Sequence, residues 1–210
     1  MALEKRFSAF FYGTLLHPKI LRRVIGNDGT HLEICPAVLL DHTRHKVKHA
    51  DYPGILPYSK SRSMLGHELE PEDRSVRGSL VLGLSKEDMG FLDVFEGDEY
   101  ARKTVHVHPL GIIVPLGAYE VPKHRVPGSA TEENPDLTPS TPDPLPPNPA
   151  ETLNPPIQCE TYIWASYPEE LATEPWSFQE FIRLNGWKWL PGEGGGDLED
   201  YLEVDRRREM

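Results

Sequence analysis

The strongest constraint on the fold is a proline-rich segment between residues 122 and 156. Eleven of the 21 prolines of the chain lie in these 35 positions, and no residue among them is aromatic. Such a segment buries too little apolar surface to offset the entropy that is lost on ordering. We therefore expect a disordered or polyproline-like insert on the surface, with the folded core built from the residues on either side.

The two flanking parts are expected to form one core. Residues 157–190 are too few to fold alone, so they must return to the structure formed by residues 7–121. The 210 residues are then a single domain over 1–210. From residue 192 the sequence is acidic and then basic, and we expect 192–210 to be a frayed charged tail.

The hydrophobic pattern outside the insert predicts about seven strands and a few short helices. Ser85 and Asp88 have the spacing of a capping box, for a helix that ends at Gly97. Residues 59–75 are polar and irregular. This order favours an α+β fold with a curled, largely antiparallel sheet or a small barrel. The predicted strands include 7–12, 33–41, 77–84, 103–108, 112–121 and 158–164, and the first predicted helix is 17–25.

The charge of the chain argues against polyanionic partners. There are 33 Asp and Glu against 22 Lys and Arg, which gives a formal net charge of −11. Such a surface repels phosphate backbones and anionic lipid headgroups, so we expect neither nucleic acid nor a membrane as a partner. An anionic substrate would have to be bound by local N–H groups or by a buried cation, against the overall field.

The expected compartment is the cytoplasm. Cys35 and Cys159 lie far apart in the sequence and suggest no disulfide framework, which fits a reducing environment. The first residues carry charge without the apolar run of a signal peptide, and no stretch approaches the roughly 20 apolar residues of a membrane span.

The first candidate for chemistry is the loop Tyr12-Gly13-Thr14-Leu15. It follows a predicted strand and precedes a predicted helix, so backbone N–H groups near the glycine can face a ligand. Such a loop suits a carboxylate or a developing oxyanion. The same pattern is also that of an ordinary strand–helix turn.

The second candidate is the acidic cluster around Glu96. A general base with a raised pKa needs a carboxylate held against apolar neighbours, and Glu96 follows Phe95 at a predicted helix end. Gly97 allows the backbone to turn so that Glu96 points inward. The alternative is an acidic, solvated turn, which is the interpretation we favour for Asp98 and Glu99.

Histidines are the third candidate. His106 and His108 share one face of a predicted strand, while His42, His45 and His49 follow a polar ribbon. Two histidines at this spacing together with a third can hold zinc. No carboxylate or cysteine lies at a recognisable metal spacing, so we expect structural or solvent-facing histidines and no metal site.

Two of these motifs together resemble a known family. Phe-Phe-Tyr-Gly-Thr-Leu at 10–15, followed by Leu-Asp-Val-Phe-Glu-Gly-Asp-Glu-Tyr at 92–100, is similar to the γ-glutamyl cyclotransferase-like superfamily. The most similar branch is its avirulence-induced-gene family of plants and fungi. The resemblance covers about 7–121 and 157–190, and the proline-rich insert departs from the family pattern.

The resemblance implies a fold, a site and a reaction. The fold is a small β-barrel with flanking helices. The loop Tyr12, Gly13, Thr14 and Leu15 binds the γ-glutamyl group, Glu96 is the acid/base, and Tyr100 lines the site. The reaction releases 5-oxoproline when the α-amine of the substrate attacks its own γ-carbonyl, and it requires no cofactor.

Two other functions are kept as alternatives. One is a non-catalytic, stress- or defence-related binding module on the same fold, in which the proline-rich loop docks a protein partner. The other is a metal-dependent hydrolase that uses the histidines. The leaving amine or peptide and the oligomeric state are left open by the sequence.

Overall fold

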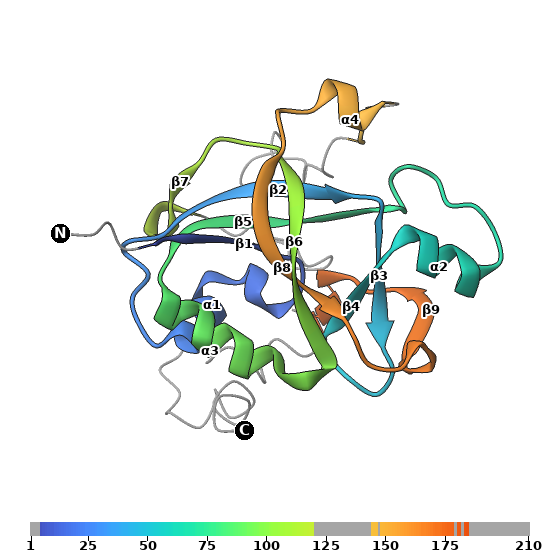
Figure 1. Ribbon diagram of the computed structural model, residues 1–210, viewed down its shortest axis with the longest axis horizontal. Coiled ribbons are helices and arrows are strands. Elements are labelled where there is room, and N and C mark those ends of the chain that lie inside the picture. Colours follow the sequence, from blue (N-terminus) through green and yellow to red (C-terminus); the bar gives the residue numbers. More distant parts are fainter. Residues whose placement is uncertain (1–4, 120–143, 147, 179, 182, 185–210) are drawn as a thin grey trace, which may run out of the picture.

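The computed structural model describes residues 5–119, 144–146, 148–178, 180, 181, 183 and 184 (Figure 1). Its strands are β1 (Phe7–Phe11), β2 (Glu33–Leu40), β3 (His42–Val47), β4 (Pro53–Pro57), β5 (Ser75–Leu84), β6 (Tyr100–Pro109), β7 (Val114–Pro115), β8 (Ile157–Trp164) and β9 (Leu171–Pro175). Its helices are α1 (Pro18–Ile25), α2 (Tyr58–Leu65), α3 (Lys86–Glu96) and α4 (Pro149–Thr152).

Five of the described strands form a closed barrel. Their order is β5-β1-β8-β6-β2, and β2 pairs again with β5 over its whole length, which closes the ring. The pair β1–β8 is parallel, whereas the other four pairs are antiparallel. The expected α+β fold, with a small, mixed, largely antiparallel barrel and short flanking helices, is confirmed.

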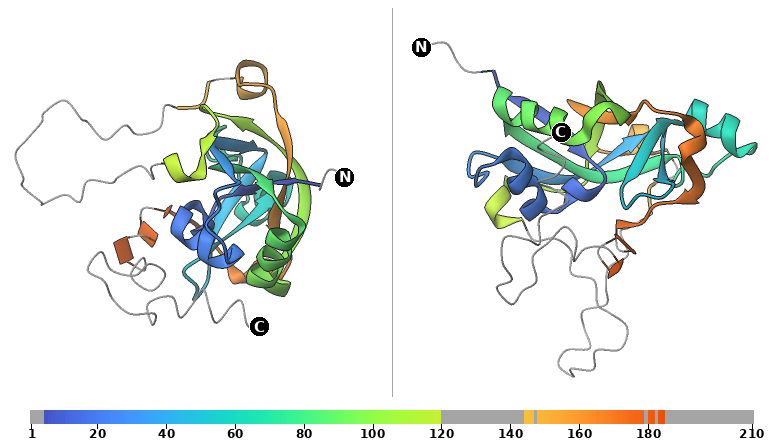
Figure 2. Two further views of the ribbon diagram at one scale, coloured as in Figure 1. Left: turned by 90° about the vertical axis from the view of Figure 1, so that its left-hand side faces the viewer. Right: turned by 90° about the horizontal axis from the view of Figure 1, so that it is seen from below.

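A smaller sheet and the helices surround the barrel. Strands β4-β3-β9 form a three-stranded sheet at one end, next to α2. Helices α1 and α3 contact each other and lie on one side of the barrel (Figures 1 and 2). No helix of the part that the structure describes is long and apolar enough to cross a membrane.

The alternation of side chains along the strands separates two hydrophobic clusters. In β1, Phe10 belongs to the cluster that includes Cys35, Leu80 and Val107 of the barrel strands. The next residue, Phe11, belongs to the cluster that includes the apolar residues of α1 and α3, among them Ile20, Leu21, Val24, Met89, Leu92 and Phe95.

Gly78 is required by the close approach of β1. A Cβ atom at this position would collide with the carbonyl oxygen of Phe11 and would lie 2.6 Å from Cζ of Phe10. Phe10 is completely buried, so its ring has no free space into which to move. The glycine therefore allows a large aromatic ring to fill the space between β1 and β5.

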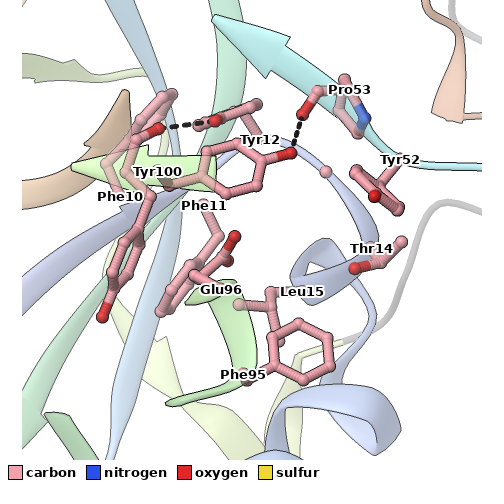
Figure 3. Close-up of a pocket in the computed structure, with 12 residues that line it drawn as sticks. Phe10, Phe11, Tyr12, Thr14, Leu15, Tyr52, Pro53, Phe95, Glu96 and Tyr100 are labelled. Atoms are coloured by element: carbon pink, nitrogen blue, oxygen red, sulfur yellow. Dashed lines mark hydrogen bonds between the residues drawn. The ribbon is translucent and has the colours of Figure 1, made fainter. Parts of the chain in front are cut away.

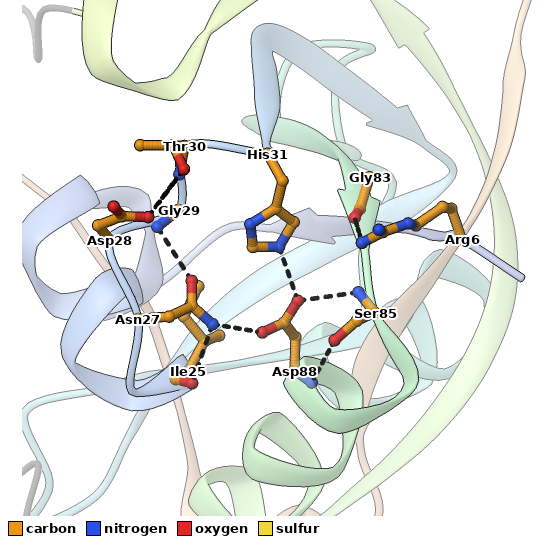
Figure 4. A network of polar contacts seen from close by, with 10 residues as sticks. All are labelled: Arg6, Ile25, Asn27, Asp28, Gly29, Thr30, His31, Gly83, Ser85 and Asp88. Atoms are coloured by element: carbon orange, nitrogen blue, oxygen red, sulfur yellow. Dashed lines mark hydrogen bonds and ion pairs between the residues drawn. The ribbon is translucent and has the colours of Figure 1, made fainter. Parts of the chain in front are cut away.

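A polar network joins α3 to the loop after α1 (Figure 4). Asp88 is almost fully buried, and its carboxylate accepts hydrogen bonds from Asn27 Nδ2 at 2.7 Å and from the backbone N–H of Ser85 at 2.8 Å. His31 Nε2 lies 3.0 Å from the same carboxylate. The backbone N–H of Asp88 donates to Ser85 Oγ, which completes the predicted capping box.

Two local expectations are wrong. Residues 59–75 include helix α2, in which Ser61 is the buried residue, so no apolar stripe marks this helix in the sequence. Of the strand expected at 112–121, the described residues 112–119 contain only β7, because the chain turns at once into the 3₁₀ turn Leu116–Ala118.

The last part of the predicted insert contacts the barrel. Helix α4 lies within it, and Asn154 Nδ2 donates to the carbonyl of Pro109 at 2.9 Å. His108 Nδ1 bonds to the carbonyl of Asn154 at 2.8 Å. Residues 120–143 and 147, and the tail predicted at 192–210, lie outside the described residues, so the division of the chain remains a prediction.

Replacement of Gly78 by alanine should destabilise the protein by about 2–3 kcal/mol, since the added methyl group has to displace backbone. The matched control is Gly90→Ala in α3, where a Cβ atom meets nothing within 4 Å. That substitution should stabilise the protein by about 0.5–1 kcal/mol. Urea denaturation of both variants measures the difference, and equal effects of the two substitutions would contradict this account of the barrel.

The Asp88 network should make stability depend on pH. Burial alone raises the pKa of Asp88, but hydrogen bonds from Ser85, His31 and Asn27 outweigh it and hold that pKa below its ordinary value. A depressed pKa gives stability that is present above the unfolded-state pKa of about 3.9 and is lost as the pH falls. Asp88→Asn should therefore cost about 1–2 kcal/mol at pH 5.

The difference between wild type and Asp88→Asn should shrink as the pH falls from about 4 towards 2. Denaturant titrations at several pH values test this, because the wild-type carboxyl group is then neutral like the amide. A difference that is constant or that grows over this range would show that the carboxylate does not stabilise the network.

Candidate active site

One small pocket lies between the end of β1, the start of β4 and the end of α3 (Figure 3). It has about 370 Å³ of empty space, part of it open to solvent, which is at the small end for ligand pockets. The structure brings all six residues predicted for the site to this pocket. The lining residues are Phe10, Phe11, Tyr12, Gly13, Thr14, Leu15, Tyr52, Pro53, Phe95, Glu96, Tyr100 and Tyr162.

The loop after β1 forms one wall of the pocket. Gly13 precedes the 3₁₀ turn Thr14–Leu16, and a Cβ atom on Gly13 would lie 3.0 Å from Cδ of Pro53. The glycine therefore lets the loop approach β4 closely. The N–H groups of Thr14 and Leu15 are the first of the turn and have no acceptor within it.

Tyr12 lies at the base of this wall. Its hydroxyl donates a hydrogen bond of 2.5 Å to the carbonyl oxygen of Tyr162. Burial first, and the nearby negative charge of Glu96 second, raise the pKa of Tyr12 well above its ordinary value, while a backbone hydrogen bond from Ile55 and the charge of Arg44 oppose them. The phenol is therefore neutral at physiological pH.

Glu96 is the last residue of α3 and reaches the pocket from the other side. The backbone N–H of the next residue, Gly97, donates to the carbonyl of Asp93, and Gly97 has a φ of 65° that favours glycine. Figure 3 shows the carboxylate of Glu96 facing the centre of the pocket, with Leu15 beside it. The negative charge of Glu96 raises the pKa of both Tyr12 and Tyr162, which places it near both phenols.

Tyr52 and Tyr100 form an aromatic side of the pocket, with ring centroids 6.5 Å apart. The Tyr100 hydroxyl donates to the carbonyl of Pro53 at 2.9 Å, and its ring packs edge-on against Trp164. The Tyr52 hydroxyl donates to Oε2 of Glu99 at 2.9 Å. We expected both Asp98 and Glu99 to lie in a solvated turn. Asp98 is exposed, as expected. The expectation is wrong for Glu99, because its carboxylate holds the pocket residue Tyr52.

Tyr162 comes from β8, after the proline-rich segment. Its hydroxyl donates to Oδ1 of Asp93 at 2.9 Å, and Asp93 in turn pairs with Arg102 at 3.2 Å. Burial, then Glu96 and then Asp93, raise the pKa of Tyr162. The phenol therefore remains protonated beside the pocket.

Sequence reasoning missed several residues of the pocket. Tyr52 and Pro53 belong to a stretch that signals a turn, and Tyr162 belongs to a stretch that signals a strand. Neither the turn pattern nor the strand pattern predicts that Tyr52, Pro53 and Tyr162 lie in the same pocket as Glu96. Phe95 was recognised as an apolar neighbour of Glu96 but not as part of the pocket wall.

His42, His45 and His108 form hydrogen bonds with groups other than histidines. His45 bonds to Ser61 Oγ at 2.9 Å and to the carbonyl of Ala172, and His42 bonds to the carbonyl of Leu40. Within the described ranges, no group of three or more His, Cys, Asp or Glu side chains is placed to hold a metal ion.

Tyr52 and Glu99 should be energetically coupled. We expect Tyr52→Phe and Glu99→Gln to destabilise the protein less in combination than the sum of the single effects, with a coupling of about 1 kcal/mol for a partly exposed hydrogen bond to a carboxylate. A double-mutant cycle by urea denaturation measures it. Coupling Tyr52→Phe with Asp98→Asn should give a value near zero, and strict additivity of the first pair would show that their hydrogen bond does not hold the aromatic wall.

Curated proteins of Arabidopsis thaliana are similar to this chain. Protein AIG2 C is 28% identical over 100 residues, which cover 48% of this chain and 51% of that protein, so the chain spans about half the length of this relative. AIG2-like protein A is 22% identical over 212 residues, which cover 95% of this chain and 94% of that protein.

A solved structure shares the fold. It is the solution structure of an Arabidopsis thaliana protein that is 19% identical, with a TM-score of 0.50 and coverage of 95% of this chain and 93% of that one. The sequence profile of the family described as gamma-glutamyl cyclotransferase, AIG2-like, matches residues 9–138, which is more than half of the chain. The chain therefore belongs to the AIG2-like γ-glutamyl cyclotransferase family.

Proposed function

We propose that this protein releases 5-oxoproline from a γ-glutamyl amine or peptide, with Glu96 as the general acid/base. The observation that carries the proposal is the position of Glu96 opposite the Tyr12–Leu15 loop in one small pocket. The two motifs are about 80 residues apart in the sequence, and membership of the family supports the same reaction.

The reaction needs positioning and one proton carrier. The α-ammonium of the substrate gives a proton to the Glu96 carboxylate, and the free amine attacks the γ-carbonyl to close a five-membered ring. The C–N bond to the leaving group then breaks as Glu96 returns its proton to the leaving nitrogen, and the extra proton of the ring nitrogen passes through solvent to the released amine, which leaves a neutral lactam and a protonated amine. Because the attack is intramolecular, a bent glutamyl chain supplies much of the rate acceleration.

The pocket is suited to each step. Its small volume and its walls of Leu15, Phe95 and Tyr100 favour a folded glutamyl chain over an extended one. The N–H groups at the start of the Thr14–Leu16 turn are proposed to bind a carboxylate or the oxyanion that forms at the γ-carbon. Proton transfer and positioning complete the reaction without a cofactor.

The first test is a panel of γ-glutamyl amines, dipeptides and isopeptides, scored by release of 5-oxoproline. Turnover of at least one compound is the expected result. If none is turned over, the alternative takes its place, namely a non-catalytic binding module whose proline-rich segment docks a protein partner.

Glu96→Gln should lower kcat by about 10²–10⁴-fold, the usual contribution of a positioned acid/base. The amide keeps the shape of the side chain but cannot accept the ammonium proton. Binding of 5-oxoproline should persist, because it does not depend on that proton. Steady-state kinetics together with calorimetric titration separate the two effects.

The matched control is Asp98→Asn, which removes the same charge two residues away at an exposed position. This variant should keep its activity, whereas Glu99→Gln is unsuitable because Glu99 holds Tyr52. Full activity of Glu96→Gln, or an equal loss in both variants, would refute the assignment of Glu96.

A further inference from the structure

Arg44 of β3 contacts the backbone of the loop that forms the pocket wall. Its Nη1 donates to the carbonyl oxygen of Tyr12 at 2.9 Å and lies 3.4 Å from the carbonyl oxygen of Arg77 in β5. Arg44 itself does not line the pocket. Arg44 therefore fixes the backbone where β1 passes into the loop, without being one of the residues that line the pocket.

The guanidinium of Arg44 is partly buried and carries its charge. Trp176 lies over it, with the ring centroid 5.3 Å from Cζ, and the Trp176 indole N–H donates to the carbonyl of Asp51. Burial lowers the pKa of Arg44 to about 10, which still leaves it protonated at neutral pH. Among the described residues no carboxylate forms an ion pair with it.

A partly buried cation that the described residues pair with no carboxylate is costly, and an apolar side chain could fill the same space. The charge is therefore better explained by what lies on the other side of the loop. Arg44 donates to the Tyr12 carbonyl, and Glu96 lines the same pocket as Tyr12, so both charges lie near the first residue of the loop. Their effects on the pKa of Tyr12 are opposite in sign.

The hydrogen bond also fixes the direction of one peptide unit. In a trans peptide the C=O and the following N–H point in opposite directions. Because the Tyr12 carbonyl points to Arg44, the N–H of Gly13 points away from Arg44. Gly13 is also one of the residues that line the pocket.

We propose that Arg44 is a positioning residue that selects ligands with an α-carboxylate. It orients the Tyr12–Gly13 peptide and places a positive charge behind it, so that the carboxylate binds at the loop and the α-ammonium lies at Glu96. The proposal rests on the proposed function, because it assigns the two ends of a γ-glutamyl head group to two ends of the same pocket. Attraction across the loop is strong because the region between the charges is poorly solvated.

The test compares 5-oxoproline with its neutral carboxamide by calorimetric titration of the full chain. Wild type should bind the acid about tenfold or more tightly than the amide. Arg44→Gln can still donate a hydrogen bond but has no charge, and it should lose this preference by weakening the acid alone. Arg44→Lys keeps the charge and should keep most of the preference.

The matched control is Arg62→Gln, which removes the same charge from an exposed arginine that pairs with Glu68. It should leave both affinities unchanged. A merely structural role of Arg44 would weaken acid and amide alike. The proposal would be overturned if Arg44→Gln still bound the acid more tightly than the amide. It would also be overturned if Arg44→Lys lost this preference to the same extent as Arg44→Gln.

A measurement on wild type covers the case in which Arg44→Gln does not fold. The Nε–Hε signal of Arg44 in a ¹H–¹⁵N spectrum should shift on titration with 5-oxoproline and shift much less with the amide. An unchanged signal during binding of the acid would overturn the role of Arg44 while the proposed function stands. Wild type that binds neither compound and turns over no γ-glutamyl substrate would overturn both.

Discussion

The parallel pairing of β1 with β8 is the constraint on which the site depends. Because the two strands run in the same direction, both end at the same end of the barrel. Strand β6 is antiparallel to β8 and begins there, with Tyr100 opposite Trp164. The end of α3 directly precedes β6, so Glu96 is brought to the loop that follows β1. Strand β8, which follows the proline-rich region in the sequence, thus brings the loop after β1 and the end of α3 together.

The sequence predicted the parts of the site that are local in the chain. The strand before Tyr12, the capping box at Ser85 and the turn at Gly97 each have a short-range signature, and each is present. The contacts of Tyr52 with Glu99 and of Arg44 with Tyr12 join residues 47 and 32 positions apart. Such contacts depend on strand register and barrel closure, which the hydrophobic pattern alone does not determine.

The four pocket tyrosines share one property that distinguishes them from Glu96. Each hydroxyl donates its proton to an acceptor of the protein: Tyr12 to a carbonyl, Tyr100 to a carbonyl, Tyr52 to Glu99 and Tyr162 to Asp93. For Tyr12 and Tyr162, burial and nearby negative charge also raise the pKa, so neither phenol gives up its proton near neutral pH. The tyrosines shape and rigidify the pocket, and the carboxylate is left as the group suited to exchange a proton with a ligand.

The net charge of −11 and an anionic ligand are compatible because the two act over different distances. At physiological ionic strength, exposed charges are screened over about 8 Å. A partly buried charge such as that of Arg44 is screened less, because Trp176 and two backbone carbonyls form part of its surroundings. We therefore expect the acidic surface to affect which large partners approach, and we propose that the loop and the charges of Arg44 and Glu96 determine what the pocket holds. A zwitterionic head group, with its negative end at the loop and its positive end at Glu96, matches this arrangement of charge, and a simple anion or cation matches only half of it.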